Sequence, residues 1–172
     1  FQDSVRLVNG SSLPVKGMTF ASENPLYVKG NYNTVTKQPS GLVADAFNVL
    51  SNNWNDANST NTALSGKTAT ATTLNSTVIT GNTETVPGQY NGGFENIHRL
   101  HENWSNVNFT YSGSVIALYN SQIATGNWIY GGNNYTAPNR IWSFDTDLAN
   151  PSYAIPGFPS VYNVAKLNYE VS

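Results

Sequence analysis

The sequence predicts an all-β protein, built as a right-handed β-solenoid or β-helix with short strands and one short helix. Apolar stretches are short, and they recur roughly every 20–30 residues, a spacing typical of solenoid coils. They end in Asn or Gly, as the stretch 26–28 does before Gly30 and Asn31. Asparagine occurs 25 times. Asn tolerates left-handed backbone and can stack in hydrogen-bonded ladders at equivalent corners of a parallel β-helix.

A β-sandwich is the alternative architecture. A sandwich needs longer alternating strands and regular hairpin turns, and no Asn-Gly hairpin pattern dominates this chain. The length of 172 residues fits a single domain, 1–172, with a sizeable core. Because the chain starts at Phe1 without a signal peptide, we expect it to be a processed or excised part of a longer protein.

The first half of the chain predicts short strands separated by turns. Strand-like runs occur at 18–21 and 26–28. The spacing of apolar residues at 42–50 fits either a buried strand pair or a short helix. Residues 55–73 are rich in Asn, Ser, Thr and Ala, which predicts an exposed loop or a weak strand. Residues 75–81 predict another short strand.

The second half contains the predicted helix, at 94–104. Its large apolar residues recur at helical spacing: Phe94, Ile97, Leu100, His101 and Trp104 would share one face. Further along, 109–124 is the strongest β region, 126–139 is an aromatic loop rich in Gly and Asn, 140–144 is a short strand, and 161–171 alternates like a strand.

The composition predicts an extracellular or cell-surface protein. Only 10% of the residues are charged. Typical soluble domains have about 25% charged residues. Polar amides and hydroxyls take their place here. The net charge of −2 and the scattered Lys and Arg residues argue against nucleic acid as a partner.

The sequence also excludes several kinds of site. Cysteine is absent, which excludes disulfides and thiolate metal sites. No stretch reaches the roughly 18 apolar residues of a membrane helix. We therefore expect no membrane insertion by this segment.

Six segments occur in a characteristic order along the chain: 17–33, 44–46, 50–54, 93–96, 102–104 and 142–147. Together they resemble the C-terminal extracytoplasmic domain of bacterial surface proteins related to PilX-type pilus-assembly proteins. The resemblance covers roughly residues 17–160. It implies a location outside the cytoplasm and a role in a surface assembly, and it carries no catalytic residues.

The chain shows no signature of an enzyme. Ten acidic residues are present, but no spacing singles out the pair that a glycosidase needs, and no Gly-x-Ser-x-Gly elbow occurs. We therefore expect a non-enzymatic structural or assembly domain of a cell-surface or pilus-associated protein, with other protein subunits as partners through an exposed strand edge.

Two binding sites are candidates. The alternative function is a carbohydrate-binding adhesin module, because exposed aromatic rings beside amides grip sugars; its predicted residues are Trp128, Tyr130, Tyr135 and Trp142. The predicted metal site is a calcium site at Asp145 and Asp147, since carboxylates two residues apart on a loop suit this oxygen-seeking ion. No other cofactor is expected.

Overall fold

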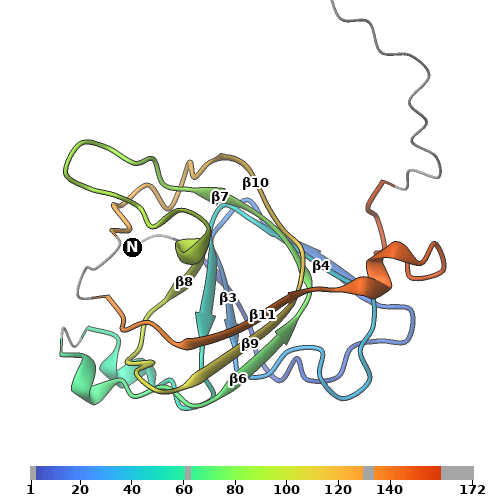
Figure 1. Cartoon of the computed structure of the whole chain (residues 1–172), viewed down its shortest axis with the longest axis horizontal. Helices are drawn as coiled ribbons and strands as arrows, with labels where there is room; N and C mark the ends of the chain where they lie inside the picture. Colours follow the sequence, from blue (N-terminus) through green and yellow to red (C-terminus); the bar gives the residue numbers. More distant parts are fainter. Residues whose placement is uncertain (1–2, 61–62, 130–133, 160–172) are drawn as a thin grey trace, which may run out of the picture.

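Three parallel sheets surround one apolar core (Figure 1). The computed structural model describes residues 3–60, 63–129 and 134–159. Sheet A has the order β1 (Val5–Leu7), β3 (Leu26–Lys29), β5 (Phe47–Leu50) and β8 (His98–Leu100). Sheet B has the order β10 (Val115–Asn120), β7 (Thr77–Asn82), β4 (Ser40–Ala44) and β2 (Met18–Ala21). Sheet C has the order β11 (Asn139–Phe144), β9 (Asn108–Gly113) and β6 (Thr72–Asn75).

The chain cycles between these sheets, so that each turn places a new strand beside the strand of an earlier turn. One turn of the chain runs from β2 in sheet B to β3 in sheet A. It then reaches the position of sheet C, where Tyr32 bridges to Leu74 of β6. Every strand pair in the described residues is parallel. This is a β-solenoid-like arrangement, and it differs from the antiparallel sheets of a sandwich. The prediction of a mostly β, solenoid-like fold is confirmed.

The core is built from stacked side chains of successive turns. In β3, Leu26 and Val28 are buried and the alternate residues point outward, as the period of two in a strand requires. The register aligns Leu26 with Phe47, and Val28 with Val49. Burial of one such side chain stabilises the fold by about 1.5–3 kcal/mol. The apolar bursts of the sequence are therefore the inward positions of short strands.

Asparagine turns one corner, as the sequence predicts. Asn33 is buried and has a left-handed φ of 58°. It lies in register with Asn75, because Tyr32 pairs with Leu74. Asn33 Nδ2 donates to the Asn75 carbonyl at 2.9 Å, and Asn75 Nδ2 donates to the Asn33 carbonyl at 2.9 Å. The two side-chain amides thus join two successive turns of the chain at a corner, where the strands end.

The predicted helix at 94–104 is wrong. This stretch forms a short 3-10 turn, η3 (Gly93–Asn96), followed by strand β8. His98 and Leu100 point inward from β8. Of the predicted helical face, Leu100 is therefore buried at the period of two of a strand, whereas Phe94 is 55% exposed. Pairing with β5 decides in favour of the strand. In the described residues, helical structure is limited to 3-10 turns: η1 (Asp56–Asn58), η2 (Leu64–Gly66), η3 and η4 (Thr146–Ala149).

The ambiguous segment 42–50 is a strand pair. Strands β4 and β5 meet at a corner of two residues, Asp45 and Ala46, both buried. The polar segment predicted as a loop contains η1 and η2, and β6 begins only at Thr72. The strand predicted at 161–171 lies outside the described residues. No helix in the described part of the chain is long and apolar enough to cross a membrane.

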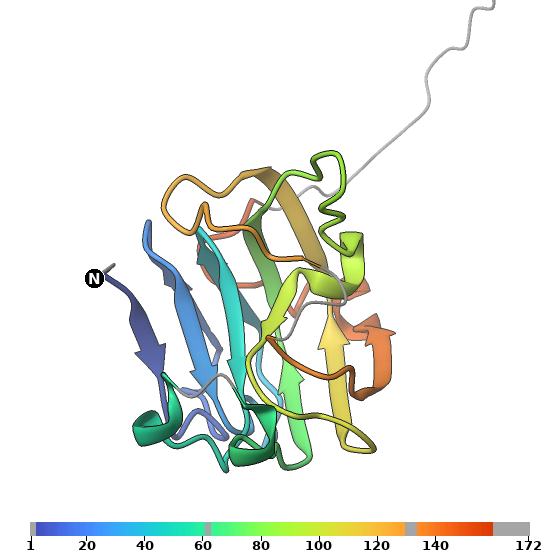
Figure 2. The same cartoon turned by 90° about the vertical axis from the view of Figure 1, so that its left-hand side faces the viewer.

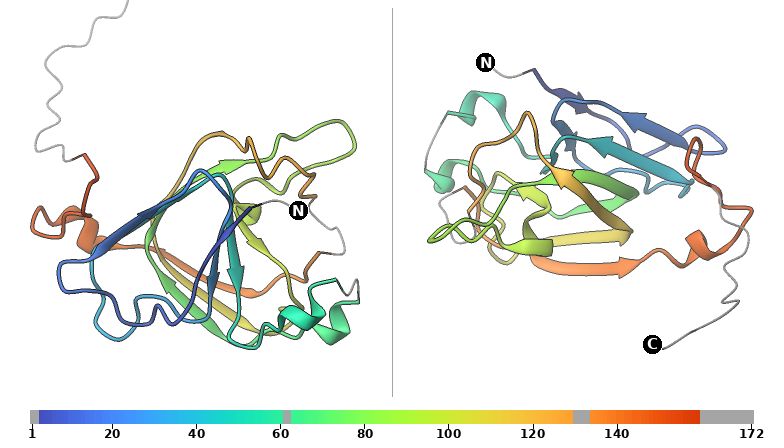
Figure 3. Two further views of the ribbon diagram at one scale, coloured as in Figure 1. Left: turned by 180° about the vertical axis from the view of Figure 1, so that it is seen from behind. Right: turned by 90° about the horizontal axis from the view of Figure 1, so that it is seen from above.

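The segment after β11 packs against the outer face of sheet B. Gly41 of β4 makes this possible, since a Cβ at this position would lie 2.7 Å from the Phe158 ring and 3.0 Å from Ile155. Thr19 of β2 donates a hydrogen bond to the Pro156 carbonyl. Figure 3 shows this segment leaving the end of β11 and lying outside the sheets.

Candidate functional site

A row of polar and aromatic side chains crosses the outer face of sheet A. The strand register aligns Arg6 with Tyr27, Tyr27 with Asn48, and Asn48 with Arg99. These are the outward positions of β1, β3, β5 and β8, which lie side by side in Figure 2. Because each residue comes from a different turn, the fold alone brings them together.

The first loop that borders this row follows β5 and begins at Ser51. Buried Glu102 holds Ser51 in place. The Glu102 carboxylate is fully buried and accepts hydrogen bonds from the backbone N–H of Ser51 at 2.6 Å and from Ser51 Oγ at 2.7 Å. Burial raises the pKa of Glu102, and the Ser51 hydrogen bonds partly offset that rise. The loop then carries Trp54 and η1 over the outer face of sheet A, in teal in Figure 2.

An ion pair holds this loop against β1. Arg6 donates to both oxygens of Asp56, with Nη1–Oδ1 at 2.6 Å and Nη2–Oδ2 at 2.8 Å, and Trp54 Nε1 donates to Oδ1 at 2.8 Å. The Arg6 and Trp54 hydrogen bonds lower the pKa of Asp56 to about 2. Such an exposed pair adds little stability. Its bidentate geometry instead sets the position of the loop.

A second loop, residues 121–129, passes over the other side of the row. The Asp45 carboxylate accepts the backbone N–H groups of Ile123 at 3.1 Å and Ala124 at 2.7 Å. Arg99 donates to the Ala124 carbonyl at 3.2 Å and lies 5.9 Å from the centre of the Trp128 ring. Both loops are therefore attached to the solenoid by buried or half-buried charged groups.

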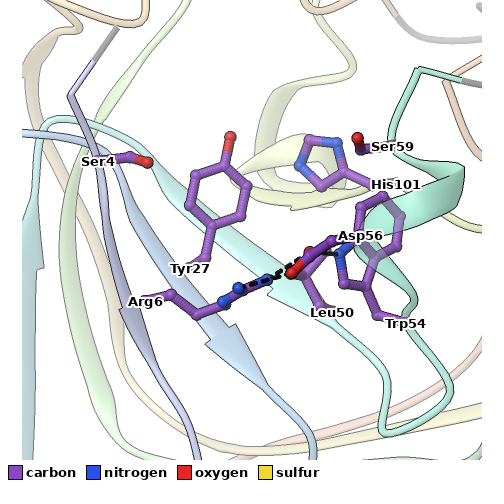
Figure 4. Close-up of a pocket in the computed structure, with 8 residues that line it drawn as sticks. All are labelled: Ser4, Arg6, Tyr27, Leu50, Trp54, Asp56, Ser59 and His101. Carbon is purple, nitrogen blue, oxygen red and sulfur yellow. Dashed lines mark hydrogen bonds and ion pairs between the residues drawn. The ribbon is translucent and has the colours of Figure 1, made fainter.

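A cavity of about 460 Å³ lies between the first loop and sheet A (Figure 4). Its volume falls within the range of about 300–1,000 Å³ that small-molecule sites occupy. Leu50 contributes an apolar side chain, while the other residues are polar or aromatic. The lining residues are Ser4, Arg6, Tyr27, Leu50, Trp54, Asp56, Ser59 and His101.

His101 is the most constrained group of this cavity. Asn48 Nδ2 donates to the Leu26 carbonyl at 3.2 Å, so Asn48 Oδ1 accepts from His101 Nε2 at 2.8 Å. The proton thus lies on Nε2, and Nδ1 is an acceptor to which the described residues donate no hydrogen bond. Burial, and then the charges of Arg99 and Lys67, lower the pKa of His101 to about 3. The ring is therefore neutral near pH 7.

The aromatic residues predicted to bind glycan do not form one cluster. Trp128 and Tyr135 are stacked, with ring centres 6.4 Å apart, and Trp128 also contacts His101 at 4.9 Å. Trp142 lies elsewhere, 5.2 Å from buried His98 and 6.2 Å from Tyr111, next to the core. Tyr130 lies outside the described residues. The glycan role of these four residues stays a prediction.

The two predicted calcium ligands share a lysine. Lys37 Nζ lies 2.7 Å from Asp145 Oδ1 and 2.8 Å from Asp147 Oδ2. Asp145 also caps η4, since its Oδ1 accepts from the Asp147 backbone N–H at 3.1 Å. Within the described residues, no three His, Cys, Asp or Glu side chains come close enough to hold a metal ion. Calcium would have to displace the Lys37 ammonium.

This competition gives the calcium hypothesis a direct test. We expect Lys37→Met to leave two unneutralised carboxylates and to increase the rise in melting temperature that millimolar calcium produces, because a ligand that binds only the folded state stabilises it. The measurement is thermal unfolding with calcium or with EGTA. Asp147→Asn in the Lys37→Met background is the control, and it should remove the response. If calcium moves neither melting temperature, the two aspartates are not a calcium site.

Comparison with known proteins finds no relative of this chain. No protein-family model matches the chain, and neither a curated protein nor a solved structure matches it. The candidate site is therefore defined by its geometry alone.

The sequence alone does not identify the cavity on sheet A. It predicts Tyr27 only as a strand residue, and Trp54, Asp56 and His101 come from segments interpreted as a strand end, a loop and a helix. The one available signal is the pair Trp54 and Asp56 in an Asn-rich loop, since a tryptophan and a carboxylate two residues apart are unusual in a segment otherwise poor in large side chains.

Proposed function

We propose that the chain is a non-enzymatic structural or assembly domain of a bacterial cell-surface or pilus-associated protein, and that it contacts a neighbouring subunit through the C-terminal end of its solenoid. The observation that carries this proposal is the apolar character of that end. Large apolar side chains there are more than half exposed: Phe94 at 55%, Leu118 at 68%, Ile141 at 52% and Phe144 at 60%.

The same end contains strand edges with which no further strand of the described residues pairs. Strands β8, β10 and β11 are the last members of sheets A, B and C in the described residues. A cavity of about 370 Å³ lies beside β11, and its lining includes Phe94, Trp142 and Phe144. An unpaired edge with exposed apolar residues is a template for another strand. Repeat proteins usually cover such ends with a polar cap.

The opposite end of the solenoid supplies the complementary surface. Strands β1 and β2 are the first members of sheets A and B, and their inward residues Val5, Leu7, Met18 and Phe20 are only partly buried. Contact between unlike ends of two copies is heterologous and propagates into a filament if it does not close. We take the solenoid to be right-handed, as parallel crossovers are in about 98% of cases.

Five carboxylates form hydrogen bonds or ion pairs within the fold, which supports a non-enzymatic role. Asp45 binds backbone N–H groups, Glu102 binds Ser51, and Asp56 binds Arg6. Asp145 and Asp147 share Lys37. Each of these groups has a structural partner, and general acid–base catalysis needs carboxyl groups poised toward a substrate instead. The composition and the resemblance to PilX-type surface proteins support a location at the cell surface.

Light scattering after size-exclusion chromatography tests the assembly role. We expect the protein to form oligomers whose size rises with concentration, and we expect Leu118→Lys and Phe144→Lys to remain monomeric, since each places a charge in the apolar contact. Tyr27→Ala, on the outer face of sheet A, is the matched control and should still assemble. A native protein that stays monomeric at all concentrations would contradict the proposal.

A further inference from the structure

We propose that the cavity on the outer face of sheet A, lined by Tyr27, Trp54, Asp56 and His101, binds a neutral oligosaccharide. This site is separate from the end of the solenoid that carries the assembly role, and it differs from the aromatic residues that the sequence pointed to. Two features of the cavity carry the proposal: the geometry of its rings and the hydrogen-bonding groups that remain open.

The rings come first. Figure 4 shows Tyr27, His101 and Trp54 around the Arg6–Asp56 ion pair. The His101 ring centre lies 5.6 Å from that of Tyr27, with an angle of 38°, and 6.4 Å from that of Trp54, with an angle of 66°. None of these three side chains is fully buried. Aromatic faces carry negative charge density and attract the weakly positive C–H groups of a pyranose face.

The open polar groups are mainly acceptors. His101 Nδ1 is unprotonated because Asn48 fixes the proton on Nε2. Asp56 is ionised, and Oδ2 accepts only one hydrogen bond from the described residues, that of Arg6. The Arg6 and Trp54 donors are already turned toward Asp56. The site therefore favours a ligand that donates hydrogen bonds. The hydroxyl groups of a sugar are such donors.

The same groups disfavour an anionic ligand. A carboxylate or phosphate would approach the Asp56 carboxylate and an unprotonated His101, and the Arg6 charge is already neutralised by Asp56 at 2.6 Å. A purely apolar ligand would leave both acceptors without partners. A neutral sugar offers an apolar face to the rings and hydroxyl donors to the acceptors. The site is also held in place, because Glu102 and Arg6 fix its loop in the absence of ligand, which lowers the entropic cost of binding.

The experiment is titration of the full chain with neutral hexasaccharides of glucose, mannose, xylose and N-acetylglucosamine, and with a galacturonate hexasaccharide as the charged comparison. Calorimetry and tryptophan fluorescence measure the binding. We expect at least one neutral hexasaccharide to bind and to change the emission of Trp54. Tyr27→Ala should weaken binding about tenfold, the order expected for loss of one aromatic stacking contact. Tyr27→Phe keeps the ring and should bind almost normally. His101→Phe keeps a ring, removes the acceptor and should also weaken binding about tenfold.

Phe144→Ala is the matched control, since it removes an exposed aromatic ring at the end of the solenoid. It should leave sugar binding unchanged. Thermal unfolding of each variant separates a lost contact from a lost fold. Absence of binding by every neutral hexasaccharide overturns the inference, as does binding that Tyr27→Ala and His101→Phe leave intact. Binding confined to uronate oligosaccharides would overturn the assignment to a neutral sugar. None of these results depends on whether the chain assembles.

Discussion

Replacing Gly113 with alanine is expected to destabilise the fold by about 3 kcal/mol and to lower the melting temperature by about 6–12 °C. Gly113 ends β9, and a Cβ at this position would lie 1.9 Å from the Ser76 carbonyl oxygen and 2.7 Å from its carbon. That carbonyl is not free to move, because Tyr111 Oη donates to it at 2.7 Å and the Ser76 N–H donates to the Ser112 carbonyl at 3.1 Å. The added methyl group must therefore push two turns of the solenoid apart.

Alanine variants at two other glycines distinguish this steric clash from the strain of a left-handed backbone. Gly88 has a left-handed φ of 77° but open space around its Cβ position. Gly88→Ala should therefore cost only about 1 kcal/mol, the strain of a left-handed alanine. Gly126 has open space and no left-handed φ. Gly126→Ala should change the free energy of unfolding by less than about 0.5 kcal/mol, as surface substitutions usually do.

Urea unfolding of the three variants measures this order of stabilities. The free energy of unfolding should fall most for Gly113→Ala, less for Gly88→Ala and least for Gly126→Ala. A Gly113→Ala protein as stable as Gly126→Ala would mean that the contact between the two turns is loose.

The sequence is sufficient to predict a mostly β, solenoid-like fold because such a fold depends on local signals. Short apolar strands and Asn at corners are both visible along the chain, and Asn33 adopts the left-handed conformation expected of it. The helix predicted at 94–104 is wrong for a physical reason. The apolar residues that share a helical spacing lie in different elements, since Phe94 belongs to η3, Leu100 to β8 and Trp104 to the turn that follows. Only the pairing of β8 with β5, about fifty residues away, decides in favour of the strand.

The candidate site cannot be predicted in the same way, because its residues meet only through the register of sheet A. Arg6, Tyr27 and Asn48 come from three turns, and nothing in their local sequence says that they align. Conversely, Trp128 and Trp142 lie close in sequence and look like one cluster. The structure places the first over Arg99 outside the solenoid and the second beside the core, since a new strand begins between them.

A buried histidine makes the stability of the fold depend on pH. His98 points inward from β8 and is 1% exposed, and neither of its ring nitrogens has a hydrogen-bond partner in the described residues. Its ring lies among those of Phe47 at 5.6 Å, Phe109 at 5.7 Å, Tyr111 at 4.5 Å and Trp142 at 5.2 Å. Burial, and then the charge of Arg140, lower the pKa of His98 to about 3. The folded protein holds this ring in the neutral form.

The direction of the effect follows from proton binding in the two states. The unfolded chain has a histidine pKa of about 6.5. Between pH 6.5 and about 3 the unfolded state therefore binds more protons than the folded state, and stability falls as the pH falls. The contribution of His98 is complete above pH 6.5, and its loss amounts to roughly 3 kcal/mol at pH 4. That is a large share of the roughly 5–15 kcal/mol that stabilises a typical domain.

We therefore expect His98→Leu to be at least as stable as the native protein at pH 7.5 and more stable by about 3 kcal/mol at pH 4. Leucine removes two buried polar atoms without hydrogen-bond partners in the described residues and cannot bind a proton. Urea unfolding at several pH values, at constant ionic strength, measures the difference. His101→Leu is the comparison: burial also lowers the pKa of His101 to about 3, so this variant should reduce the pH dependence to a similar degree. Unlike His98→Leu, it should lower stability at pH 7.5, because it removes the hydrogen bond to Asn48. If the native protein and His98→Leu lose stability in parallel from pH 7.5 to pH 4, protonation of His98 does not cause acid unfolding.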